Sequence, residues 1–566
     1  MEAGEILLRK GLLDQRQLDL SRDAQDNGTR LDQAAVDLGF ITEEAALKAL
    51  GEEVGLKFVD LAEAEIDLSL LPGFPQRFIH RETLFPIRQS NGTLIVATSD
   101  PFNLYPLDEL SAATDMTIMP VLASGVEISK LIKTHLGVGS ETIEGLLAQT
   151  HDEDRVDLLG ELESDGSELS EMAQEPSVVR LVNEILVEAV ESRSSDVHIE
   201  STEQGLSIRY RIDGILHPQP VPPEISRFRA AIISRLKIMA RLNIAERRLP
   251  QDGRIELNVA GREVDVRVSV IPMIHGEGIV LRLLDKSSME FSLRKLGMEA
   301  DIYKTFHDLI RLPHGIILVT GPTGSGKTTT LYSSLLEIRS GATKIITTED
   351  PVEYQLEGIN QIQVHSKIGL SFANSLRSIL RHDPDIILVG EVRDLETAEN
   401  AIQASLTGHL VFSTLHTNDA AGAYTRLVDM GVEPFLVSST VEAVMAQRLV
   451  RTLCSHCKEP YTPSDDDLPE DFPRELLSGA TIYRQTGCRK CREVGYSGRL
   501  GLFELLVNTE QIRQLAHDRA STWAIEQAAV EGGMRTLRQD GWKKVLDGRT
   551  TIDEVIRVTK ANVMRR

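Results

Sequence analysis

Hydrophobic positions change their spacing several times along the chain, and each change predicts a different kind of element. Apolar residues recur at helical spacing over 178–190, whereas they alternate with polar residues over 206–212 and 264–270. A second helical stretch, 228–242, lies between the alternating segments. Alternation is typical of strands with one buried face, and arginines occupy several of the polar positions. The pattern therefore predicts a compact α+β domain over 176–290.

The region that follows has the pattern of an α/β domain. Uninterrupted apolar runs of strand length occupy 315–320, 386–389 and 410–415, and a helical pattern over 328–339 follows the first of them. Such runs are typical of parallel strands that are buried on both faces. We therefore predict an α/β domain over 291–450.

The N-terminal part contains a weak internal repeat with an offset of 28 positions. Each copy has a short amphipathic stretch, a glycine and a second stretch that opens at Asp14 or Thr42, both of which suit the cap of a helix. This predicts a helical repeat module over 1–56. A strand-like run at 94–97 then indicates a mixed α/β docking domain over 57–139.

Composition sets residues 140–175 apart from the rest of the chain. Positions 141–175 hold twelve acidic residues and one basic residue, which is −11 of the net charge of −24. Few large apolar residues and a high net charge are typical of a flexible linker. The acidic balance of the chain also argues against direct nucleic-acid binding, which needs clustered lysine and arginine.

Cysteine usage and the lack of targeting segments indicate a reducing compartment. The four cysteines form two Cys-x-x-Cys pairs separated by 30 residues, which suits a tetrahedral structural Zn²⁺ site in a small lobe over 451–500. No apolar run reaches the roughly 18–20 residues of a membrane span, and no basic signal-peptide start is present. We expect a cytoplasmic protein with a helical C-terminal region over 501–566. The predicted zinc ligands are Cys454, Cys457, Cys488 and Cys491.

Residues 321–328 match the phosphate-binding loop pattern at every required position. They lie between a predicted strand and a predicted helix, where glycines turn backbone N–H groups toward phosphates at a helix N-terminus. Lys327 would neutralise β- and γ-phosphate oxygens, and the Thr328 hydroxyl would ligate Mg²⁺. The predicted ATP-binding residues of this segment are Gly321, Pro322, Thr323, Gly324, Ser325, Gly326, Lys327, Thr328 and Thr329.

Carboxylates follow two of the predicted strands. Glu391 comes just after 386–389, where phosphate-loop ATPases carry the acid that polarises the attacking water. Gly390 replaces the aspartate that usually precedes this acid, so Glu391 would serve as base, as organiser of Mg²⁺, or as both. A second group of acids follows the run 345–348, at the edge where open α/β sheets hold ligands, with a turn role for Asp350 as the alternative. This group is Glu349, Asp350 and Glu353.

Two histidines, His409 and His416, bound the predicted strand 410–415. A lone histidine is more often structural than catalytic, but these two flank one strand of a nucleotide-binding fold. An imidazole in either charge state can sense a γ-phosphate. We therefore treat both as candidate catalytic residues.

Several runs of the sequence together resemble the secretion ATPases of type II systems and type IV pili, over about 176–505. The runs 261–269 and 449–454 are most similar to the general secretion pathway protein E branch, with the pilus extension ATPase as the alternative. The other runs that carry the resemblance are 195–200, 209–214, 321–328, 349–353, 390–394, 408–409 and 416–418.

This resemblance implies a multidomain α/β protein with a RecA-like phosphate-loop ATPase core, preceded by an α+β, PAS-like domain. It implies a homo-hexamer that binds ATP and Mg²⁺ between these two parts, with Glu391 as the catalytic carboxylate. The acids around Asp350 would form the family's aspartate box, and His409 and His416 its histidine box. Arginine suits the charge that builds on a transferred phosphoryl group. The arginines that match the family's phosphate-side set are Arg267, Arg282, Arg377, Arg381, Arg393 and Arg426.

The N-terminal repeat resembles a module that binds cyclic di-GMP in some relatives, where each copy begins Arg-Leu-Gly. Here the copies begin at Glu2 and Arg30, and Asp32 stands in place of the second glycine. One arginine and one glycine of the pattern are therefore missing. We prefer docking to a protein partner on the inner face of the inner membrane over cyclic di-GMP binding.

Together these features predict a cytoplasmic, hexameric ATPase whose motion drives assembly of a pilus-like fibre for type II secretion. The first alternative is a pilus-extension motor with the same chemistry. The second is a nucleic-acid translocase or regulator, which should carry a basic stripe. The third is a scaffold that binds ATP and hardly hydrolyses it, an option that Gly390 leaves open.

Overall fold

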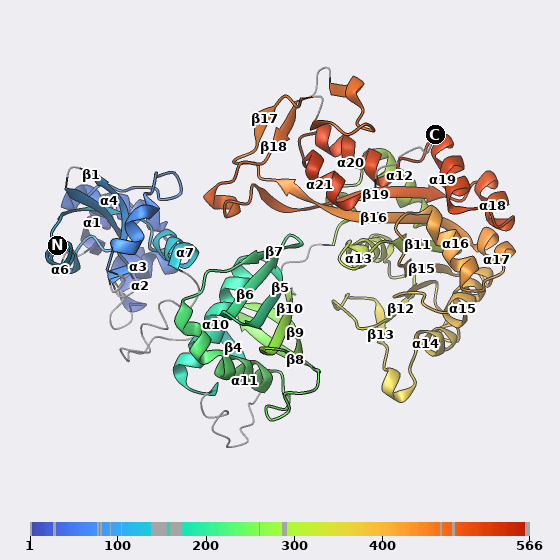
Figure 1. The fold of residues 1–566 in the computed structure, drawn as a ribbon, viewed down its shortest axis with the longest axis horizontal. Helices are drawn as coiled ribbons and strands as arrows, with labels where there is room; N and C mark the ends of the chain where they lie inside the picture. Colours follow the sequence, from blue (N-terminus) through green and yellow to red (C-terminus); the bar gives the residue numbers. More distant parts are fainter. Residues whose placement is uncertain are drawn as a thin grey trace. The chain divides into compact units, whose positions relative to one another are not determined.

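The computed structural model of the chain consists of two compact units, Met1–Ser287 and Ser288–Arg566 (Figure 1). The acidic segment predicted at 140–175 lies outside the described residues except for 156–158 and 173–175. The described residues are 3–25, 30–75, 78–79, 82–90, 92–103, 105–136, 156–158, 173–259, 261–285, 291–464, 467–477 and 481–560.

Four short helices form the N-terminal module. Asp14 caps the second helix in a reciprocal capping box with Gln17, and Thr42 caps the fourth. Gly11 and Gly39 adopt positive φ after the first and third helices, so each half of the module has the order helix, glycine, helix. The helices are α1 (Ala3–Arg9), α2 (Gln15–Asp23), α3 (Leu31–Asp37) and α4 (Glu43–Val54).

A small three-stranded sheet follows the helical module. Its strands have the order β1-β2-β3, with an antiparallel first pair and a parallel second pair. The elements are η1 (Leu68–Gly73), β1 (Phe85–Ser90), β2 (Thr93–Thr98), α6 (Tyr105–Thr114), β3 (Thr117–Leu122) and α7 (Gly125–Leu136). The mixed α/β pattern expected from the sequence is present.

The rest of the first unit is built on a seven-stranded antiparallel sheet of order β4-β8-β9-β10-β5-β6-β7. One face packs its apolar residues against α10 (Pro176–Glu191) and α11 (Arg229–Met239) in a single buried cluster. The opposite face carries the arginines that alternate with these apolar positions. The strands are β4 (Val156–Leu158), β5 (Ser194–Thr202), β6 (Gly205–Ile212), β7 (Ile215–Pro218), β8 (Gln251–Val259), β9 (Arg262–Met273) and β10 (Gly276–Asp285), with η2 (Pro223–Phe228) between β7 and α11.

The second unit contains a seven-stranded sheet of order β13-β12-β14-β15-β11-β16-β19, in which only β19 is antiparallel to its neighbour. Ile316 and Leu318 of β11 belong to one hydrophobic cluster, and Ile317 and Val319 belong to another, so helices cover both faces. The strands are β11 (Gly315–Thr320), β12 (Ile345–Glu349), β13 (Asn360–Gln363), β14 (Ile386–Val389), β15 (Leu410–Leu415), β16 (Val441–Leu453) and β19 (Tyr496–Val507).

The helices of this unit divide between the two faces of the sheet. The cluster on one face includes α12 and α13, and the cluster on the other includes α14 to α19. Their bounds are η3 (Leu293–Lys295), α12 (Ala300–Leu309), α13 (Lys327–Ile338), η4 (Ser366–Ile368), α14 (Phe372–Ile379), α15 (Leu395–Leu406), α16 (Ala421–Asp429), α17 (Pro434–Thr440), α18 (Glu510–His517), α19 (Thr522–Glu531), α20 (Leu537–Leu546) and α21 (Ile552–Val558). Among the described residues, no helix combines the length and the apolar character that a bilayer crossing requires.

The cysteine-containing segment is an insertion between two paired strands of this sheet, β16 and β19. The sequence analysis predicted a helical region from 501 onward, and this was wrong for 501–507, which form the second half of β19. Nearly every residue of 501–507 is buried, so the segment lacks the alternation of apolar and polar positions that would have marked a strand. The insertion also shares a core with α20 and α21, in which Phe472 packs edge-on against Trp542. Its elements are β17 (Glu459–Tyr461), η6 (Arg474–Leu477), β18 (Ile482–Arg484) and η7 (Arg489–Cys491).

Candidate functional site

The phosphate-binding loop joins the buried strand β11 to the N-terminus of α13. Gly321, Gly324 and Gly326 have φ of 149°, 78° and 88°, values that favour glycine. A Cβ on Gly321 would lie 2.6 Å from the Gln447 carbonyl oxygen, and one on Gly326 would lie 2.8 Å from Gln447 Nε2. The glycines therefore allow the loop to fold closely against β16, with the first N–H groups of α13 free to bind an anion.

Lys327 is half-buried at the start of α13, and its ammonium group is held inside its own loop. Nζ donates hydrogen bonds to the carbonyl oxygens of Gly321 at 2.8 Å and Pro322 at 3.1 Å. Burial lowers the pKa of Lys327, and the negative charge of Glu391 opposes that shift. Phosphate oxygens are stronger partners for an ammonium group than carbonyls are, so a nucleotide would displace these two bonds. Thr328 is exposed, which leaves its hydroxyl accessible to a metal ion.

Glu391 lies at the carboxyl end of β14, between the ends of β12 and β15. Its neighbours in sequence are fixed to both strands, by a bond from Gly390 N to Thr348 O of 2.8 Å and one from Val392 N to Thr414 O of 3.0 Å. A Cβ on Gly390 would lie 3.2 Å from Thr348 O. This close approach gives a physical reason why glycine, and not aspartate, precedes Glu391 here.

The Glu391 carboxylate has two cationic or potentially cationic neighbours. Oε1 lies 2.5 Å from an Arg393 NH2 group, and Oε2 lies 3.3 Å from Nε2 of His416. The Glu391 side chain is 12% exposed, whereas Arg393 and His416 are largely exposed. The hydrogen bond to Glu391, together with the charges of Glu391 and Asp350, raises the pKa of Arg393.

The three acids of the predicted aspartate box occupy different environments. Glu349 is buried: its Oε1 accepts hydrogen bonds from Thr347 Oγ1 at 2.6 Å and Gln361 Nε2 at 3.1 Å, and its Oε2 accepts one from the Tyr332 hydroxyl. Burial and the Glu349 charge raise the pKa of Tyr332 above its usual value. Asp350 is exposed at the end of β12, and Glu353 is half-buried. Glu349 therefore serves as a structural acceptor between β12 and α13, while Asp350 faces solvent near Arg393.

The structure separates the two predicted histidines. His416 follows β15 and lies at Glu391, whereas His409 precedes β15 and lies at the opposite edge of the sheet. A strand rises about 3.3 Å per residue, so the seven steps between the two histidines separate them by about 23 Å. His409 Nδ1 is 2.8 Å from the Ala404 carbonyl oxygen and 3.1 Å from Thr407 Oγ1, contacts that fix the turn between α15 and β15. Only His416 is brought to Glu391 within the chain.

The predicted arginines of the second unit lie on its surface. Arg377 pairs with Glu396, and Arg381 donates to the Arg377 carbonyl oxygen at 2.9 Å, both at the end of α14. Arg426 is exposed on α16. Of the four predicted in this unit, Arg393 alone pairs with Glu391.

The predicted arginines of the first unit lie in one row on the polar face of its sheet. Arg267 and Arg282 are direct cross-strand neighbours on β9 and β10, and Arg282 Nε lies 3.1 Å from Asp196 Oδ1. The same row continues to Arg254 on β8 and Arg211 on β6, which the sequence analysis did not select. Arginines at alternating strand positions were a visible signal, but only the cross-strand register places them in one line.

Two further residues at the phosphate loop were also missed. Gln447 of β16 accepts a hydrogen bond from Thr330 Oγ1 at 2.7 Å, and its neighbour Arg448 donates to the Asn418 carbonyl oxygen at 2.7 Å. Burial lowers the pKa of Arg448. An adjacent polar pair inside the otherwise apolar run 443–450 was the available signal.

The four cysteines come together as predicted. Their Sγ atoms all lie within 4.8 Å of one another, with distances of 4.0 Å for Cys454–Cys488, and 3.7 Å for both Cys457–Cys491 and Cys488–Cys491. Four thiolates around Zn²⁺ with Zn–S bonds of about 2.3 Å are about 3.8 Å apart at the corners of a tetrahedron. The spacing and the donor set therefore fit a structural zinc ion.

Comparison with known proteins agrees with this geometry. Residues 171–557 match the family described as Type II/IV secretion system protein, and residues 54–142 match the MshEN domain. The chain is 44% identical over 569 residues to the type II secretion system protein E of Xanthomonas campestris pv. campestris, with 99% of each chain covered. It is 42% identical over 557 residues to the type IV pilus assembly ATPase PilB of Myxococcus xanthus, with 98% of each chain covered.

A third relative and a solved structure extend the comparison. The type II secretion system protein E of Pseudomonas aeruginosa is 51% identical over 393 residues, which is 69% of this chain and 78% of that protein. The X-ray structure of the Yersinia pseudotuberculosis ATPase DotB aligns with a TM-score of 0.51 and 20% identity, covering 73% of this chain and 99% of that chain. At this identity the likeness to DotB concerns the fold alone.

Proposed function

The chain belongs to the type II/IV secretion system protein family and is an ATPase, and we propose that it is a hexameric motor that powers pseudopilus assembly for type II secretion. One observation carries the proposal: the carboxyl ends of four parallel strands meet at one edge. The phosphate loop follows β11, Glu391 follows β14, His416 follows β15 and Asp350 follows β12. A nucleotide on the loop would therefore present its γ-phosphate to the acid that activates water.

Each residue at this edge has a role that its contacts support. Lys327 and the first N–H groups of α13 bind β- and γ-phosphate oxygens, and Thr328 offers its hydroxyl to Mg²⁺, which neutralises phosphate charge when bound. Glu391 takes the proton of the attacking water, and Arg393 leaves Glu391 to meet charge on the phosphoryl group. Arg267 and Arg282, in the arginine row of the first unit, remain candidates for phosphate binding because they match the family's arginine set.

Steady-state ATP hydrolysis and nucleotide affinity of the purified hexamer test this assignment. We expect Lys327→Ala to lose ATP affinity, and Glu391→Gln to keep ATP affinity while kcat falls by about 10²-fold or more. Glu337→Gln, near the far end of α13, is the matched control and should behave like the wild type. If Glu391→Gln hydrolyses ATP like the wild type, Glu391 is not the base and the scaffold alternative replaces the motor.

The choice of fibre rests on full-length similarity to two kinds of motor. Relatives named type II secretion system protein E share up to 51% identity, which favours secretion, and the similar PilB keeps pilus extension as the alternative. We place the protein in the cytoplasm, bound to the inner membrane through a partner. Complementation of a type II secretion ATPase deletion should restore export of a secreted enzyme. Restoration of surface pili in a pilus-ATPase deletion, without export, would support the alternative.

The N-terminal module is proposed to dock on an inner-membrane secretion protein and not to bind cyclic di-GMP. Arg30 is already occupied: its guanidinium lies 2.5 Å from Asp32 of the same module and 2.7 Å from Asp100, which follows β2. A guanine base would have to compete with both carboxylates. Isothermal titration of the full chain with cyclic di-GMP should show no binding, whereas Asp32→Gly would free Arg30. Micromolar binding by the wild type would reverse this proposal.

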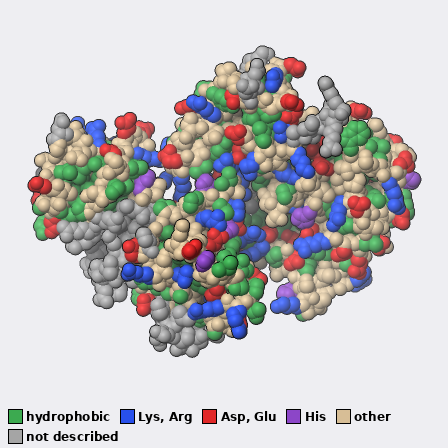
Figure 2. All heavy atoms as spheres, in the orientation of Figure 1, with side chains coloured by type: hydrophobic (Ala, Val, Ile, Leu, Met, Phe, Trp, Pro, Cys, Tyr) green, Lys and Arg blue, Asp and Glu red, His purple; other side chains and the backbone are tan. Residues whose placement is uncertain are grey.

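The nucleic-acid alternative is less well supported by surface charge. On the face that Figure 2 draws, acidic and basic side chains are mixed over the second unit, and the chain has a net charge of −24. Phosphate-backbone binding needs clustered positive charge. A gel-shift assay at low salt distinguishes the secretion motor from a nucleic-acid translocase. A translocase would bind single- or double-stranded DNA, and a secretion motor should not.

A further inference from the structure

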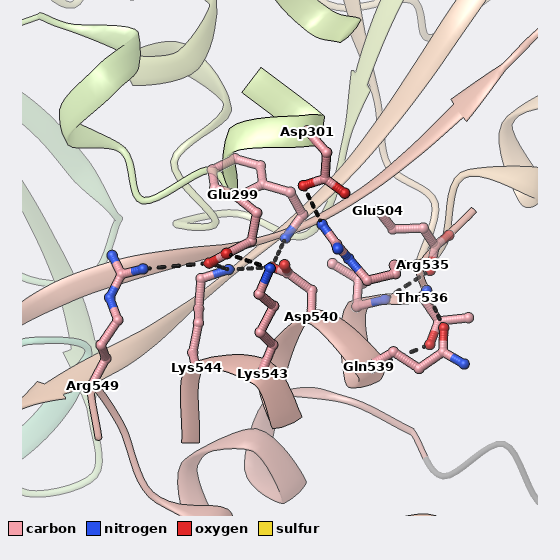
Figure 3. A network of polar contacts seen from close by, with 12 residues as sticks. Glu299, Asp301, Glu504, Arg535, Thr536, Gln539, Asp540, Lys543, Lys544 and Arg549 are labelled. Atoms are coloured by element: carbon pink, nitrogen blue, oxygen red, sulfur yellow. Dashed lines mark hydrogen bonds and ion pairs between the residues drawn. The ribbon is translucent and has the colours of Figure 1, made fainter. Parts of the chain in front are cut away.

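Glu504 of β19 is a buried carboxylate that joins two helix N-termini. Its Oε1 accepts a hydrogen bond from Ala420 N at 2.8 Å, and its Oε2 accepts one from Leu537 N at 3.1 Å. Ala420 is the N-cap of α16, and Leu537 is the first residue of α20. Figure 3 shows Glu504 beside the start of α20, near Thr536 and Gln539. The residue is 3% exposed, so both contacts are shielded from water.

The two helix ends explain how a carboxylate is tolerated in this core. The first N–H groups of a helix carry partial positive charge and lack partners within the helix, and Glu504 satisfies one from each helix. Burial, with the charges of Asp419 and Glu526, nevertheless raises the pKa of Glu504 to about 7. The positive charge of Arg448, from β16, is attracted to Glu504.

On one side, Glu504 holds the loop 416–420 that reaches the ATPase site. Thr417 N donates a hydrogen bond of 2.9 Å to Oγ1 of Thr320, the residue directly before the phosphate loop. Asn418 is held by Arg448, and His416 lies 3.3 Å from Glu391. The loop is therefore attached to β11 at one point and to Glu504 at its end.

On the other side, Glu504 contacts a firmly held helix. Asp540 and Lys544 of α20 form a buried ion pair, and Asp540 Oδ2 accepts a hydrogen bond from Phe503 N at 2.9 Å. Glu299, just before α12, lies 2.9 Å from Lys543 and 3.5 Å from Arg549 (Figure 3). These contacts make α20, the adjoining part of β19 and the start of α12 one connected network.

We propose that Glu504 is a positioning residue for ATP hydrolysis. It holds loop 416–420, and through this loop His416, in a fixed position relative to the C-terminal helices. The inference rests on the proposed function of Glu391. Its consequence is that the C-terminal helices and the ATPase site are coupled through one carboxylate. A displacement of α20 would release or shift Ala420, and with it the neighbour of Glu391.

Glu504→Gln tests the proposal because it keeps the side-chain shape. The amide oxygen of glutamine can still accept from one of the two backbone N–H groups. The amide NH₂ then faces the second N–H group and cannot accept a hydrogen bond from it. We expect kcat to fall about tenfold, with the KM for ATP within about twofold of wild type. Wild-type kcat should also fall as pH drops below about 7, because a protonated Glu504 loses one acceptor. That acidic limb should be absent from the variant.

Glu554→Gln is the matched control. Glu554 is also a buried acid that joins a C-terminal helix to β16, through Arg451 N at 2.9 Å, but it does not touch loop 416–420. This control should unfold at lower temperature and keep the wild-type pH profile. Equal losses of kcat in both variants, with unchanged pH profiles, would show that Glu504 acts only through general stability.

Hydrogen–deuterium exchange supplies a second readout, independent of turnover. Peptides covering 416–424 should exchange faster in Glu504→Gln than in the wild type or in Glu554→Gln, and unchanged exchange would overturn the proposal. If the wild type does not hydrolyse ATP, the proposed function fails while this exchange comparison still decides the coupling. If Glu504→Gln does not fold, Glu504→Asp, which retracts the carboxylate, should show the same faster exchange.

Discussion

Arg393 lies two residues after Glu391, and its guanidinium is 2.5 Å from Oε1 of that glutamate. The Arg393 guanidinium therefore competes with water for this oxygen of the carboxylate. The arginine and the γ-phosphate would attract each other more strongly than the arginine and a single carboxylate do. Nucleotide binding would therefore release Glu391 for its role with water at the moment when a phosphate is present.

This arrangement predicts that Arg393→Ala lowers kcat. The change frees Glu391, but it also removes positive charge next to the transferred phosphoryl group. An arginine supplied in trans commonly raises kcat by about 10³-fold or more, and we expect kcat to fall by about 10²- to 10³-fold here. Steady-state ATP hydrolysis at saturating ATP measures the kcat of this variant. Arg393→Lys keeps the charge and should recover part of the rate. A rate above wild type in Arg393→Ala would mean that the pair only restrains Glu391.

A second prediction concerns Gln447, which lies against two glycines of the phosphate loop and accepts from Thr330. Gln447→Leu leaves the buried Thr330 hydroxyl without that partner and loosens the support of the loop. We expect the KM for ATP to rise about tenfold with a smaller change in kcat, since the loop binds phosphates in both ground and transition states. Glu442→Gln, at the start of β16 beside Arg513, is the control. An unchanged KM would contradict a supporting role.

A third prediction concerns the buried acceptor Glu349. Tyr332→Phe removes the hydroxyl that donates to Glu349 Oε2, so one oxygen of a buried carboxylate loses its partner. We expect the free energy of unfolding to fall by about 1–3 kcal/mol, measured by urea denaturation. Tyr424→Phe is a matched control, because that buried hydroxyl has no hydrogen-bond partner among the described residues. Equal destabilisation in both variants would show that ring packing, and not the Glu349 bond, is responsible.

Local pattern was enough to predict the buried strands β11, β14 and β15, the phosphate loop and the carboxylates at strand ends. Glu391 and Lys327 belong to short motifs whose spacing follows directly from strand–loop–helix geometry. The cysteine cluster was equally accessible, since Cys-x-x-Cys spacing reflects the ligand geometry of zinc. The approach of His416 to Glu391 was not predicted, because it depends on β14 and β15 being neighbours in the sheet.

Contacts that depend on strand register or that follow a long insertion could not be predicted from local sequence pattern. Gln447 reaches the loop because β16 pairs with β11, and Glu504 is placed by an antiparallel strand that follows the whole cysteine insertion. His409 shows the complementary case: a motif residue close in sequence to His416 lies at the other end of β15. The separation of the two histidines follows from the predicted strand between them, whereas the contacts of Gln447 and Glu504 are not encoded in the spacing of residues along one segment.

The zinc site gives a final prediction, because its lobe shares a core with α20. Trp542 is buried against Phe472 of the insertion, whereas Trp523 is 70% exposed on α19. In a Trp523→Phe background, removal of zinc by a strong chelator should shift the Trp542 emission to longer wavelength, as the lobe loses the thiolate anchor that holds its two ends together. Cys457→Ser should show the shift before chelation and contain less zinc by elemental analysis. If the metal leaves and the emission does not move, the core around Trp542 holds the lobe without help from the four cysteines.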